Sequence, residues 1–380
     1  MTVGPAPKTG LQLTAQRAGI YFVTLRCGGL RATHRIEAFV PSAQIELSAR
    51  PLPGRCADSA ITGDGKRLLC VGGGVTVYDL DTLKELGHTV EHVFDMWGIA
   101  TQGELFATAS AGCGSHCTQG GETTAGARLY RVQPDGAPQL LAVLTTERSN
   151  EVAFFGSTVV VTTDGAVQKF DVRDPAHPRR VGCARGTYGG SLPVALPPAG
   201  MGGGEPDLLD VSPTQVRRIA GGVLGMDCSG EAPVAGTLRL SDAPSFLPIV
   251  DVSFIADAGG GDAHAFLLAA RAGTPNQPRV VGGYHIVDLR TWAMSRLFFQ
   301  SDNEAYGSVA FDDRLLIANS ARVALYDTSG LAHGDPPRAL AATSLGVVGV
   351  PMRMYQTAEG TRMVADRRVW TLGVRPLPAK

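Results

Sequence analysis

One stretch of the chain decides the fold. Residues 152–172 read VAFFGSTVVVTTDGAVQKFDV, and residues 309–327 repeat this pattern almost without gaps as VAFDDRLLIANSARVALYD. Each copy holds an apolar strand, a tight polar turn, a second apolar strand, another turn and a third strand ending in an aromatic residue and Asp. Residues 60–79 (AITGDGKRLLCVGGGVTVYD) are a third copy, in which Gly63-Asp64-Gly65 suits a hairpin turn that needs positive φ. The repeated unit is therefore a β-meander.

Weaker copies of the meander fill the intervals along the chain. They span residues 99–132, 192–219, 252–289 and 352–372. The starts of the copies fall roughly 40 to 60 residues apart, which is the length that a four-stranded propeller blade with variable loops needs. The 48 glycines and 24 prolines indicate a turn-rich chain with short strands, and no stretch has the sustained periodicity of an amphipathic helix. The sequence thus predicts an all-β, seven-bladed β-propeller.

The two ends of the chain are expected to close this ring together. The last copy supplies only three strands, whereas Gln44-Ile-Glu-Leu-Ser48 alternates like a strand and has no partner within its own repeat. We therefore predict that it forms the outer strand of the last blade, which removes two open sheet edges. On this prediction the propeller domain covers residues 43–380.

The first 42 residues do not follow the repeat of the propeller domain. Residues 11–39 (LQLTAQRAGIYFVTLRCGGLRATHRIEAF) are expected to form a β-hairpin that turns at Gly28-Gly29. The segment Ala18-Gly-Ile-Tyr21, followed by Cys27, resembles the closing strands of a bacterial immunoglobulin-like domain, although a whole domain of that kind needs about 100 residues. An isolated hairpin is marginal in water, so we expect residues 1–42 to be an extension that docks on the propeller or on a partner.

A second resemblance concerns the repeats themselves. Residues 167–182 (VQKFDVRDPAHPRRVG) resemble the bacterial LVIVD-type propeller repeat, with an apolar strand, Asp-Val, an Asp-Pro turn and a final outer strand. Leu325-Tyr-Asp-Thr328 and Ile286-Val-Asp-Leu-Arg290 echo the same pattern. The Gly-His and Trp-Asp pairs of WD repeats are missing, and propeller repeats of this kind imply a fold rather than a reaction.

Composition and charge narrow the class of partner. The formal net charge is −1, and the basic residues form no stripe, so the electrostatic signature of a nucleic-acid binder is missing. No run approaches the ~18 apolar residues of a membrane span. The seven cysteines leave two interpretations open: a few disulfides in an extracytoplasmic or cell-surface protein, which we favour, or buried thiols in a cytoplasmic one.

The most conspicuous polar cluster is Cys113-Gly-Ser-His116-Cys117. Two thiols and an imidazole are zinc ligands, but a structural zinc site wants four ligands and no nearby residue supplies the fourth. We favour a small disulfide between Cys113 and Cys117 that pins an exposed insertion. Free thiols and a metal site remain the alternatives.

The starts of the innermost strands converge on one mouth of a propeller's central channel, so residues at these starts are the candidate binding site. They are Asp95, Trp97, Asn150, Glu151, Asp251, Asn303, Glu304, Tyr306 and Arg353. Aromatic and Arg side chains dominate recognition patches. The four carboxylates of Asp95, Glu151, Asp251 and Glu304 are also hard ligands of the kind that calcium prefers, and this arrangement resembles the plan of lactonase-type propellers.

Two functional hypotheses follow from these observations. The first is a non-enzymatic scaffold that binds a protein or glycan through loops lengthened at residues 112–126, 197–206 and 258–278, surface-associated or part of a larger bacterial assembly. The second is a metal-dependent hydrolase or lactonase that uses the channel carboxylates. A third possibility is a subunit of a larger assembly, docked through the N-terminal hairpin. We favour the scaffold, with no catalytic residue and no cofactor assigned.

Overall fold

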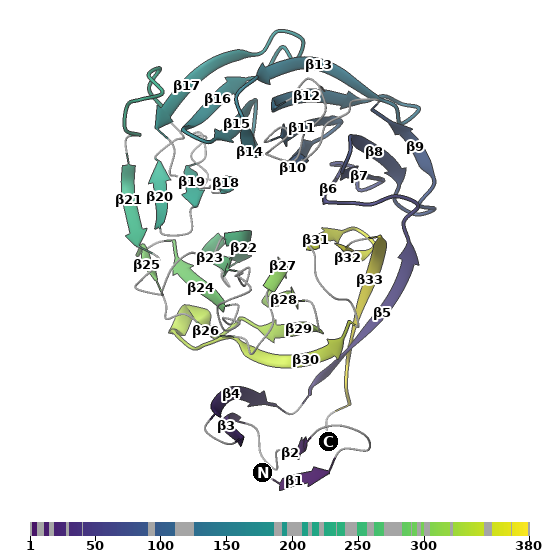
Figure 1. Ribbon diagram of the computed structural model, residues 1–380, viewed down its shortest axis with the longest axis vertical. Coiled ribbons are helices and arrows are strands. Elements are labelled where there is room, and N and C mark those ends of the chain that lie inside the picture. The colour runs from purple at the N-terminus through teal and green to yellow at the C-terminus, as the bar shows by residue number, and fades with distance from the viewer. Residues whose placement is uncertain are drawn as a thin grey trace.

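The computed structural model describes most of the strands of this chain. It covers residues 2–5, 11–14, 19–27, 30–39, 41–89, 96–110, 125–185, 192–195, 207–211, 215–219, 224–232, 234–239, 249–256, 262–269, 283–289, 291–294, 298–299, 305–319, 322–345, 352–365 and 367–378. Within these residues the regular structure is β-strand apart from one 3-10 turn, η2 (Leu331–His333). The sheets stand in a ring around a common axis (Figure 1), so the predicted all-β propeller is confirmed.

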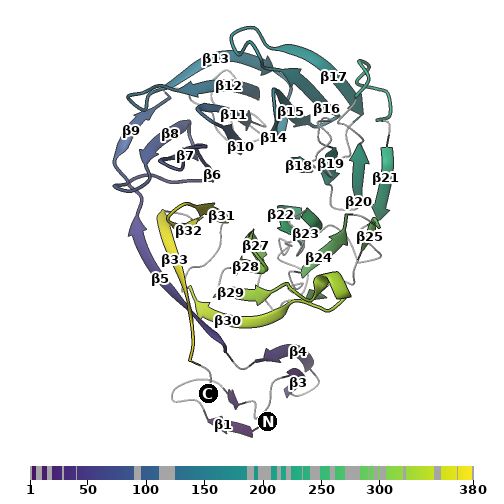
Figure 2. The same ribbon diagram turned by 180° about the vertical axis from the view of Figure 1, so that it is seen from behind.

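Each sheet of the ring runs from a strand near the axis to a strand at the rim, and Figure 2 shows the same order from behind. The innermost strands are β6 (Asp58–Ile61), β10 (Met96–Gln102), β14 (Ser149–Phe155), β18 (Leu192–Ala195), β22 (Ile249–Ala256), β27 (Ala305–Phe311) and β31 (Met352–Thr357). The second strands are β7 (Arg67–Val71), β11 (Leu105–Ser110), β15 (Thr158–Thr163), β19 (Leu208–Val211), β23 (Asp262–Ala269), β28 (Arg314–Asn319) and β32 (Gly360–Ala365). The third strands are β8 (Val75–Asp79), β12 (Gly126–Val132), β16 (Ala166–Asp171), β20 (Gln215–Ile219), β24 (Gly283–Asp288), β29 (Arg322–Asp327) and β33 (Arg368–Pro376). The outer strands are β9 (Glu85–His88), β13 (Pro138–Thr145), β17 (Arg179–Arg185), β21 (Val234–Arg239), β25 (Ala293–Met294) with β26 (Phe298–Phe299), β30 (Arg338–Ser344) and β5 (Ala43–Pro51).

Six of these sheets are built from consecutive strands, and one combines the two ends of the chain. In that sheet β33 pairs antiparallel with β5 along the whole length of both strands, from Arg368 opposite Pro51 to Pro376 opposite Ala43. Ile45 lies opposite Val374 in this register and is 6% exposed. The strand that the sequence predicts around residue 45 therefore lies on the last meander of the chain.

The Asp at the end of the third strand, which follows an aromatic residue in β8, β16 and β29 and a valine in β24, has a structural role. In four sheets its carboxylate accepts a hydrogen bond from the backbone N–H of a residue two or three positions later in the chain. The distances are 2.7 Å for Asp79, 3.0 Å for Asp171, 3.2 Å for Asp288 and 3.0 Å for Asp327. Such a bond fixes the turn that leads to the outer strand. Hydrogen bonds from Arg173 lower the pKa of Asp171 to about 2. The repeated Asp is therefore a turn cap, which explains why its position is the same in four sheets.

Seven apolar clusters hold the ring together, and each joins two neighbouring sheets. Phe106 and Tyr130 stack at 4.8 Å between ring centroids and pack on Val77 of the preceding sheet. At the seam between the last and first sheets, Val369 packs with Leu68. Because strands alternate their side chains between two faces, each sheet contributes one apolar face to each neighbour. Burial of this kind contributes about 25 cal/mol per Å² of apolar surface removed from water, so stability is spread around the whole ring.

The structure corrects the repeat alignment by one residue. The sequence comparison sets Val152 over Val309, but the hairpin turns match Phe155 with Phe311, because Phe155 pairs with Thr158 and Phe311 pairs with Arg314. A shift of one residue moves every side chain of a strand to the other face. Apolar residues fill both faces of these inner strands, so the sequence alone does not fix the register. The turn at Gly63-Asp64-Gly65 is as expected, and Gly65 has φ +70°.

The N-terminal segment forms two hairpins beside the ring. β1 (Thr2–Pro5) pairs with β2 (Leu11–Thr14), and β3 (Gly19–Cys27) pairs with β4 (Leu30–Ala38). Both lie outside the circle of sheets in Figure 1; β3 and β4 are nearer to β30, and β1 and β2 lie farther out, beside the C-terminus. Just after β4, the partly buried Phe39 packs on a cluster that contains Ile255 and Leu315. The chain is thus anchored to the ring at the point where the hairpins end.

Candidate functional site

Four innermost strands carry a β-bulge at the same level near the ring axis. The extra residues are Trp97 in β10, Asn150 in β14, Val250 in β22 and Tyr306 in β27. A bulge bends its strand and changes the direction of the side chains around it, and bulges are common near functional sites. Glu151 and Asp251 follow the bulges of their strands directly. The positions that the sequence predicts for the channel mouth therefore coincide with a repeated irregularity of the backbone.

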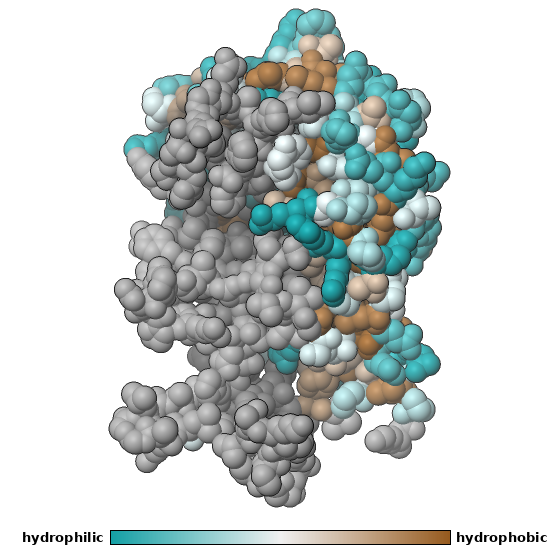
Figure 3. Space-filling model, turned by 45° about the vertical axis from the view of Figure 1, so that its right-hand side comes forward, coloured by the Kyte–Doolittle hydropathy of each residue, from teal (hydrophilic) through white to brown (hydrophobic). Residues whose placement is uncertain are grey.

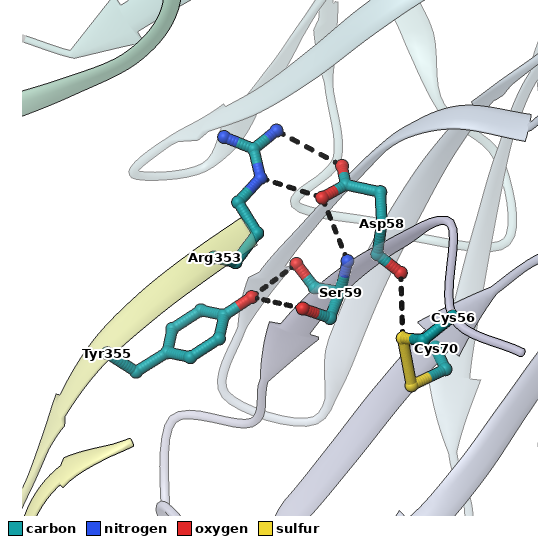
Figure 4. Close-up of a disulfide and its surroundings, with 6 residues drawn as sticks. All are labelled: Cys56, Asp58, Ser59, Cys70, Arg353 and Tyr355. Atoms are coloured by element: carbon teal, nitrogen blue, oxygen red, sulfur yellow. Dashed lines mark hydrogen bonds and ion pairs between the residues drawn. A yellow bond between two sulfur atoms is a disulfide. The ribbon is translucent and has the colours of Figure 1, made fainter. Parts of the chain in front are cut away.

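Arg353 of β31 lies at the centre of the polar cluster. Its Nε and Nη2 donate to the two carboxylate oxygens of Asp58 at 2.7 and 3.1 Å, a bidentate pair, as Figure 4 shows. Its Nη1 lies 3.7 Å from Oδ1 of Asp251. The side chain of Asp58 is 4% exposed, and that of Arg353 is 21% exposed. Because Asp58 starts β6 and Asp251 lies in β22, one guanidinium joins three of the innermost strands.

Asp251 is held by the neighbouring sheet as well. Its Oδ2 accepts hydrogen bonds from the backbone N–H and the hydroxyl of Ser308 in β27, at 2.6 and 3.0 Å. The Ser308 hydroxyl lies 2.6 Å from the hydroxyl of Ser253. Burial raises the pKa of Asp251, while Arg353 and the Ser308 donors act in the opposite direction. These contacts fix the orientation of the carboxylate.

Tyr355 ties the same strand, β31, to the first sheet. Its hydroxyl donates to the carbonyl oxygen of Ser59 at 2.5 Å and lies 2.8 Å from the Ser59 hydroxyl. The Ser59 N–H in turn donates to Oδ1 of Asp58 at 2.8 Å. Burial raises the pKa of Tyr355, so the phenol stays protonated and serves as a donor. The seam between the first and last sheets is therefore a continuous hydrogen-bonded network.

Glu151 faces this cluster from β14, and Gly98 of β10 makes room for it. A Cβ at position 98 would lie 2.5 Å from Oε2 of Glu151 and 3.1 Å from its Cα. Burial raises the pKa of Glu151 to about 8, and the nearby Asp58 and Asp251 act in the same direction, whereas Arg353 opposes them. Three carboxylates thus surround a single guanidinium, and Glu151, with its pKa raised to about 8, carries a proton at neutral pH.

We expect Glu151→Gln to change the pH dependence of stability. The raised pKa means that the folded protein keeps a proton that the unfolded chain releases above about pH 4.5. Stability therefore falls as pH rises from about 4.5 to about 8, and Gln removes this contribution. Thermal denaturation of both proteins should give equal Tm values near pH 4.5 and a higher Tm for the Gln variant at pH 8. Identical curves at both pH values would show that Glu151 is ionised and solvated in the folded protein.

The structure brings together only part of the predicted site. Glu151, Asp251 and Arg353 form one cluster, whereas the Asn150 amide points to the exposed Asp164, whose carboxylate accepts its hydrogen bond at 3.3 Å. The described strands β10 and β27 contain Trp97 and Tyr306, but only their backbone is described. Asp95, Asn303 and Glu304 lie outside the described residues.

Sequence reasoning missed Asp58, Ser59, Ser308 and Tyr355. Asp58 was detectable, because it pairs with Val71 in the way that Glu151 pairs with Thr162 and so holds the equivalent place in its repeat. The serines and Tyr355 gave no such signal. Their roles depend on contacts between sheets, which the repeat pattern does not specify.

The structure argues against the alternative of a calcium site, because a positively charged side chain lies among the candidate ligands. The described residues contain no group of three or more His, Cys, Asp or Glu side chains placed to hold a metal ion. Glu151 and Asp251 both face the Arg353 guanidinium, and a divalent ion beside them would be repelled by this positive charge. Two of the four proposed ligands, Asp95 and Glu304, fall outside the described residues.

Two disulfides occur within the described residues, and neither is the predicted one. Cys56 bonds to Cys70 and Cys183 bonds to Cys228. The first lies beside the polar cluster, where Cys56 Sγ is 3.3 Å from the Asp58 carbonyl oxygen (Figure 4). Cys113, His116 and Cys117 lie outside the described residues, so the pairing of Cys113 with Cys117 stays a prediction.

Comparison with known proteins identifies the fold alone. No protein-family model and no curated protein matches the chain in sequence. Among solved structures, the WD40 domain of Pan2 from Neurospora crassa is similar, with a TM-score of 0.56 and 10% identity over 86% of this chain and 91% of that one. Sqt1 from Saccharomyces cerevisiae is similar with a TM-score of 0.54 and 10% identity over 84% of this chain and 83% of that one. The chain therefore shares the β-propeller fold with these proteins, and its resemblance to LVIVD-type repeats stays a prediction.

Proposed function

We propose that this protein is a non-enzymatic scaffold: a seven-bladed β-propeller, residues 43–380, closed by its N-terminal strand and binding a protein or glycan partner. The observation that carries the proposal is the engagement of the central charged groups with one another. Arg353 and Asp58 form a bidentate pair, and Asp251 is fixed by Ser308. Groups held in this way brace the ring, which leaves recognition to the loops and to the residues around the bulges.

The bulged positions supply the recognition residues of this proposal. Trp97, Asn150 and Tyr306 are the extra residues of their strands, so their backbone leaves the regular ladder at one level of the ring. Aromatic residues bury a large area at a small cost in side-chain entropy, and they are therefore frequent anchors of binding surfaces. We infer that a partner contacts the ring around these positions. The long insertions at residues 112–126, 197–206 and 258–278 fall mainly outside the described residues.

The location and the N-terminal extension belong to the same proposal. Two disulfides support an extracytoplasmic or cell-surface protein, because such bonds persist in oxidising compartments. Within the described part of the chain, no helix is long and apolar enough to cross a membrane. We propose that residues 1–42, with their two hairpins beside the ring, dock this protein into a larger bacterial assembly. Figure 3 shows hydrophobic patches among hydrophilic residues on one side of the molecule, a mixture typical of protein surfaces.

The proposal is tested by removing the two bulged aromatics. The double variant Trp97→Ala/Tyr306→Ala is compared with the wild-type protein for binding on a glycan array and for crosslinked partners in the cells that produce it. We expect at least about a tenfold loss of affinity, because truncation of an aromatic hot spot costs 2 kcal/mol or more. Val143→Ala on the exposed face of β13 serves as the matched control, since Val143 is 49% exposed and far from the bulges in the strand order.

The enzymatic alternative makes a different prediction for the same site. A metal-dependent hydrolase would hold a stoichiometric divalent ion, detected by elemental analysis, and Asp95→Asn/Glu151→Gln would remove it. Such an ion, together with partner binding that is unchanged in the aromatic double variant, would overturn the scaffold proposal.

A further inference from the structure

The segment that follows β20 crosses the outer edge of the neighbouring sheet. The carbonyl oxygens of Gly225 and Gly230 accept hydrogen bonds from the backbone N–H groups of Cys183 (2.6 Å) and Arg185 (2.7 Å) in β17. Both donors point away from β16, toward the rim. Residues 224–230, which we call the edge cover, thus occupy the place that another strand would take on this sheet.

One apolar contact seats the edge cover against the sheet. Leu224 is 7% exposed and packs in the cluster that contains Leu208 and Ile219. A Cβ at Gly182 would lie 2.8 Å from the Leu224 Cβ, so the glycine provides the space for this side chain. The rest of the edge cover is exposed or half-buried, and Met226 is 60% exposed. Within the described residues, two backbone hydrogen bonds, the buried Leu224 and a contact from Arg180 to Cys228 thus hold the edge cover non-covalently.

The Cys183–Cys228 disulfide supplies the covalent attachment. Cys183 is fully buried, whereas Cys228 lies half-buried in the edge cover. Nη1 of Arg180 lies 3.6 Å from Cys228 Sγ. A guanidinium at this distance stabilises a thiolate on Cys228 and makes it a better leaving group. The bond thus joins a buried cysteine to a half-buried one, and a cation lies beside the sulfur of the half-buried Cys228, which must later leave.

The other described disulfide has the opposite surroundings. Cys56 and Cys70 are 4% and 2% exposed, and both belong to the apolar cluster that joins the first and last sheets. Neither sulfur is accessible to a thiol reagent unless the seam opens. The two disulfides of one chain should therefore differ strongly in their reactivity toward thiols.

We propose that Cys183–Cys228 is a redox-sensitive latch that holds the edge cover on β17. A thiolate of a dithiol reductant attacks Cys228 Sγ, the S–S bond breaks, and Cys183 leaves as a thiolate that takes up a proton. The second thiol of the reductant then attacks its own sulfur in the mixed disulfide, and Cys228 leaves as a thiolate beside Arg180. Two electrons pass to the protein, and the reductant becomes a cyclic disulfide. The edge cover is then attached only by its weak contacts, and the β17 edge opens.

The experiment is a titration of the whole protein with dithiothreitol, followed by alkylation, mass analysis and amide hydrogen exchange. We expect Cys183 and Cys228 to be alkylated at a reductant concentration that leaves Cys56–Cys70 intact. In that state the amides of Cys183 and Arg185 should exchange at least about tenfold faster, while the strands of the other sheets stay protected. Cys228→Ser should show the same local exchange without reductant.

Two charge variants test whether Arg180 speeds the reduction of Cys183–Cys228 or whether the exposure of this disulfide alone explains its reactivity. Arg180→Gln should slow the reduction of Cys183–Cys228 by roughly threefold, because Cys228 becomes a poorer leaving group. Arg173→Gln, which removes an exposed guanidinium from the turn before β17, should leave the rate unchanged. Reduction of both disulfides at the same reductant concentration, or amides of Cys183 and Arg185 that stay protected after reduction, would overturn the proposal.

Discussion

Asp58→Ala is expected to lower the free energy of unfolding by about 3–5 kcal/mol, because it removes one partner of a mostly buried ion pair. Without Asp58, the Arg353 guanidinium loses the bidentate partner that its Nε and Nη2 contact at 2.7 and 3.1 Å. The contact from its Nη1 to Asp251 is 3.7 Å long, which is too long to replace the lost hydrogen bonds. Denaturation in urea, monitored by circular dichroism, measures the loss directly. Asp58→Asn keeps the shape of the side chain and one acceptor, so its loss should be smaller.

Two comparisons test the explanation itself. The variant Asp164→Ala removes the partner of Arg148 in an exposed pair, whose side chains are each 58% exposed, and should change stability by less than about 1 kcal/mol. The double variant Asp58→Ala/Arg353→Met also removes the guanidinium that has lost its bidentate partner, and it should recover part of the loss. If Asp58→Ala is as stable as the wild-type protein, water solvates Arg353 and the pair does not brace the ring.

Deletion of residues 1–52 is expected to abolish cooperative unfolding, whereas deletion of residues 1–40 should leave it intact. The longer deletion removes β5, which is the hydrogen-bonding partner of β33. Burial of Ile45 alone contributes about 1.5–3 kcal/mol, and the loss also exposes the edge of β33 and the cluster around Trp370. Differential scanning calorimetry and gel filtration at several concentrations would record the broad transition and the association that an open edge promotes.

The shorter deletion is the matched control for this experiment. It keeps Ser42, whose N–H donates to Leu340 at 3.0 Å and whose carbonyl accepts from Leu377 at 2.9 Å. It removes Phe39, which is partly buried against its cluster, so a small decrease in Tm is expected. A protein without residues 1–52 that unfolds in one sharp transition would show that β5 is dispensable for the ring.

Local patterns in the sequence were sufficient to predict the meander. The turn residues and the apolar strands recur within short spans, and each constrains the backbone on its own, as the positive φ of Gly65 shows. The missing outer strand was also predictable, because residues 44–48 alternate and have no partner nearby. The register of the inner strands was not, since Val152 and Val309 have apolar residues on both sides and nothing local distinguishes the two faces.

The residues of the candidate site were likewise predictable only in part. Glu151, Asp251 and Arg353 were predicted because they stand near the starts of innermost strands, which the repeat itself locates. Asp58 contacts Arg353 across 295 positions of sequence, and the Cys183–Cys228 pair was one of many possible pairings of seven cysteines.

The amino-acid sequence by itself determined the class of fold, because hydrophobic alternation and turn chemistry act between residues that are close along the chain and recur in every copy. Only the tertiary structure decided which carboxylate pairs with Arg353, which cysteines bond and how β17 is covered. These contacts join separate sheets, and they depend on distances that arise only when the ring has formed.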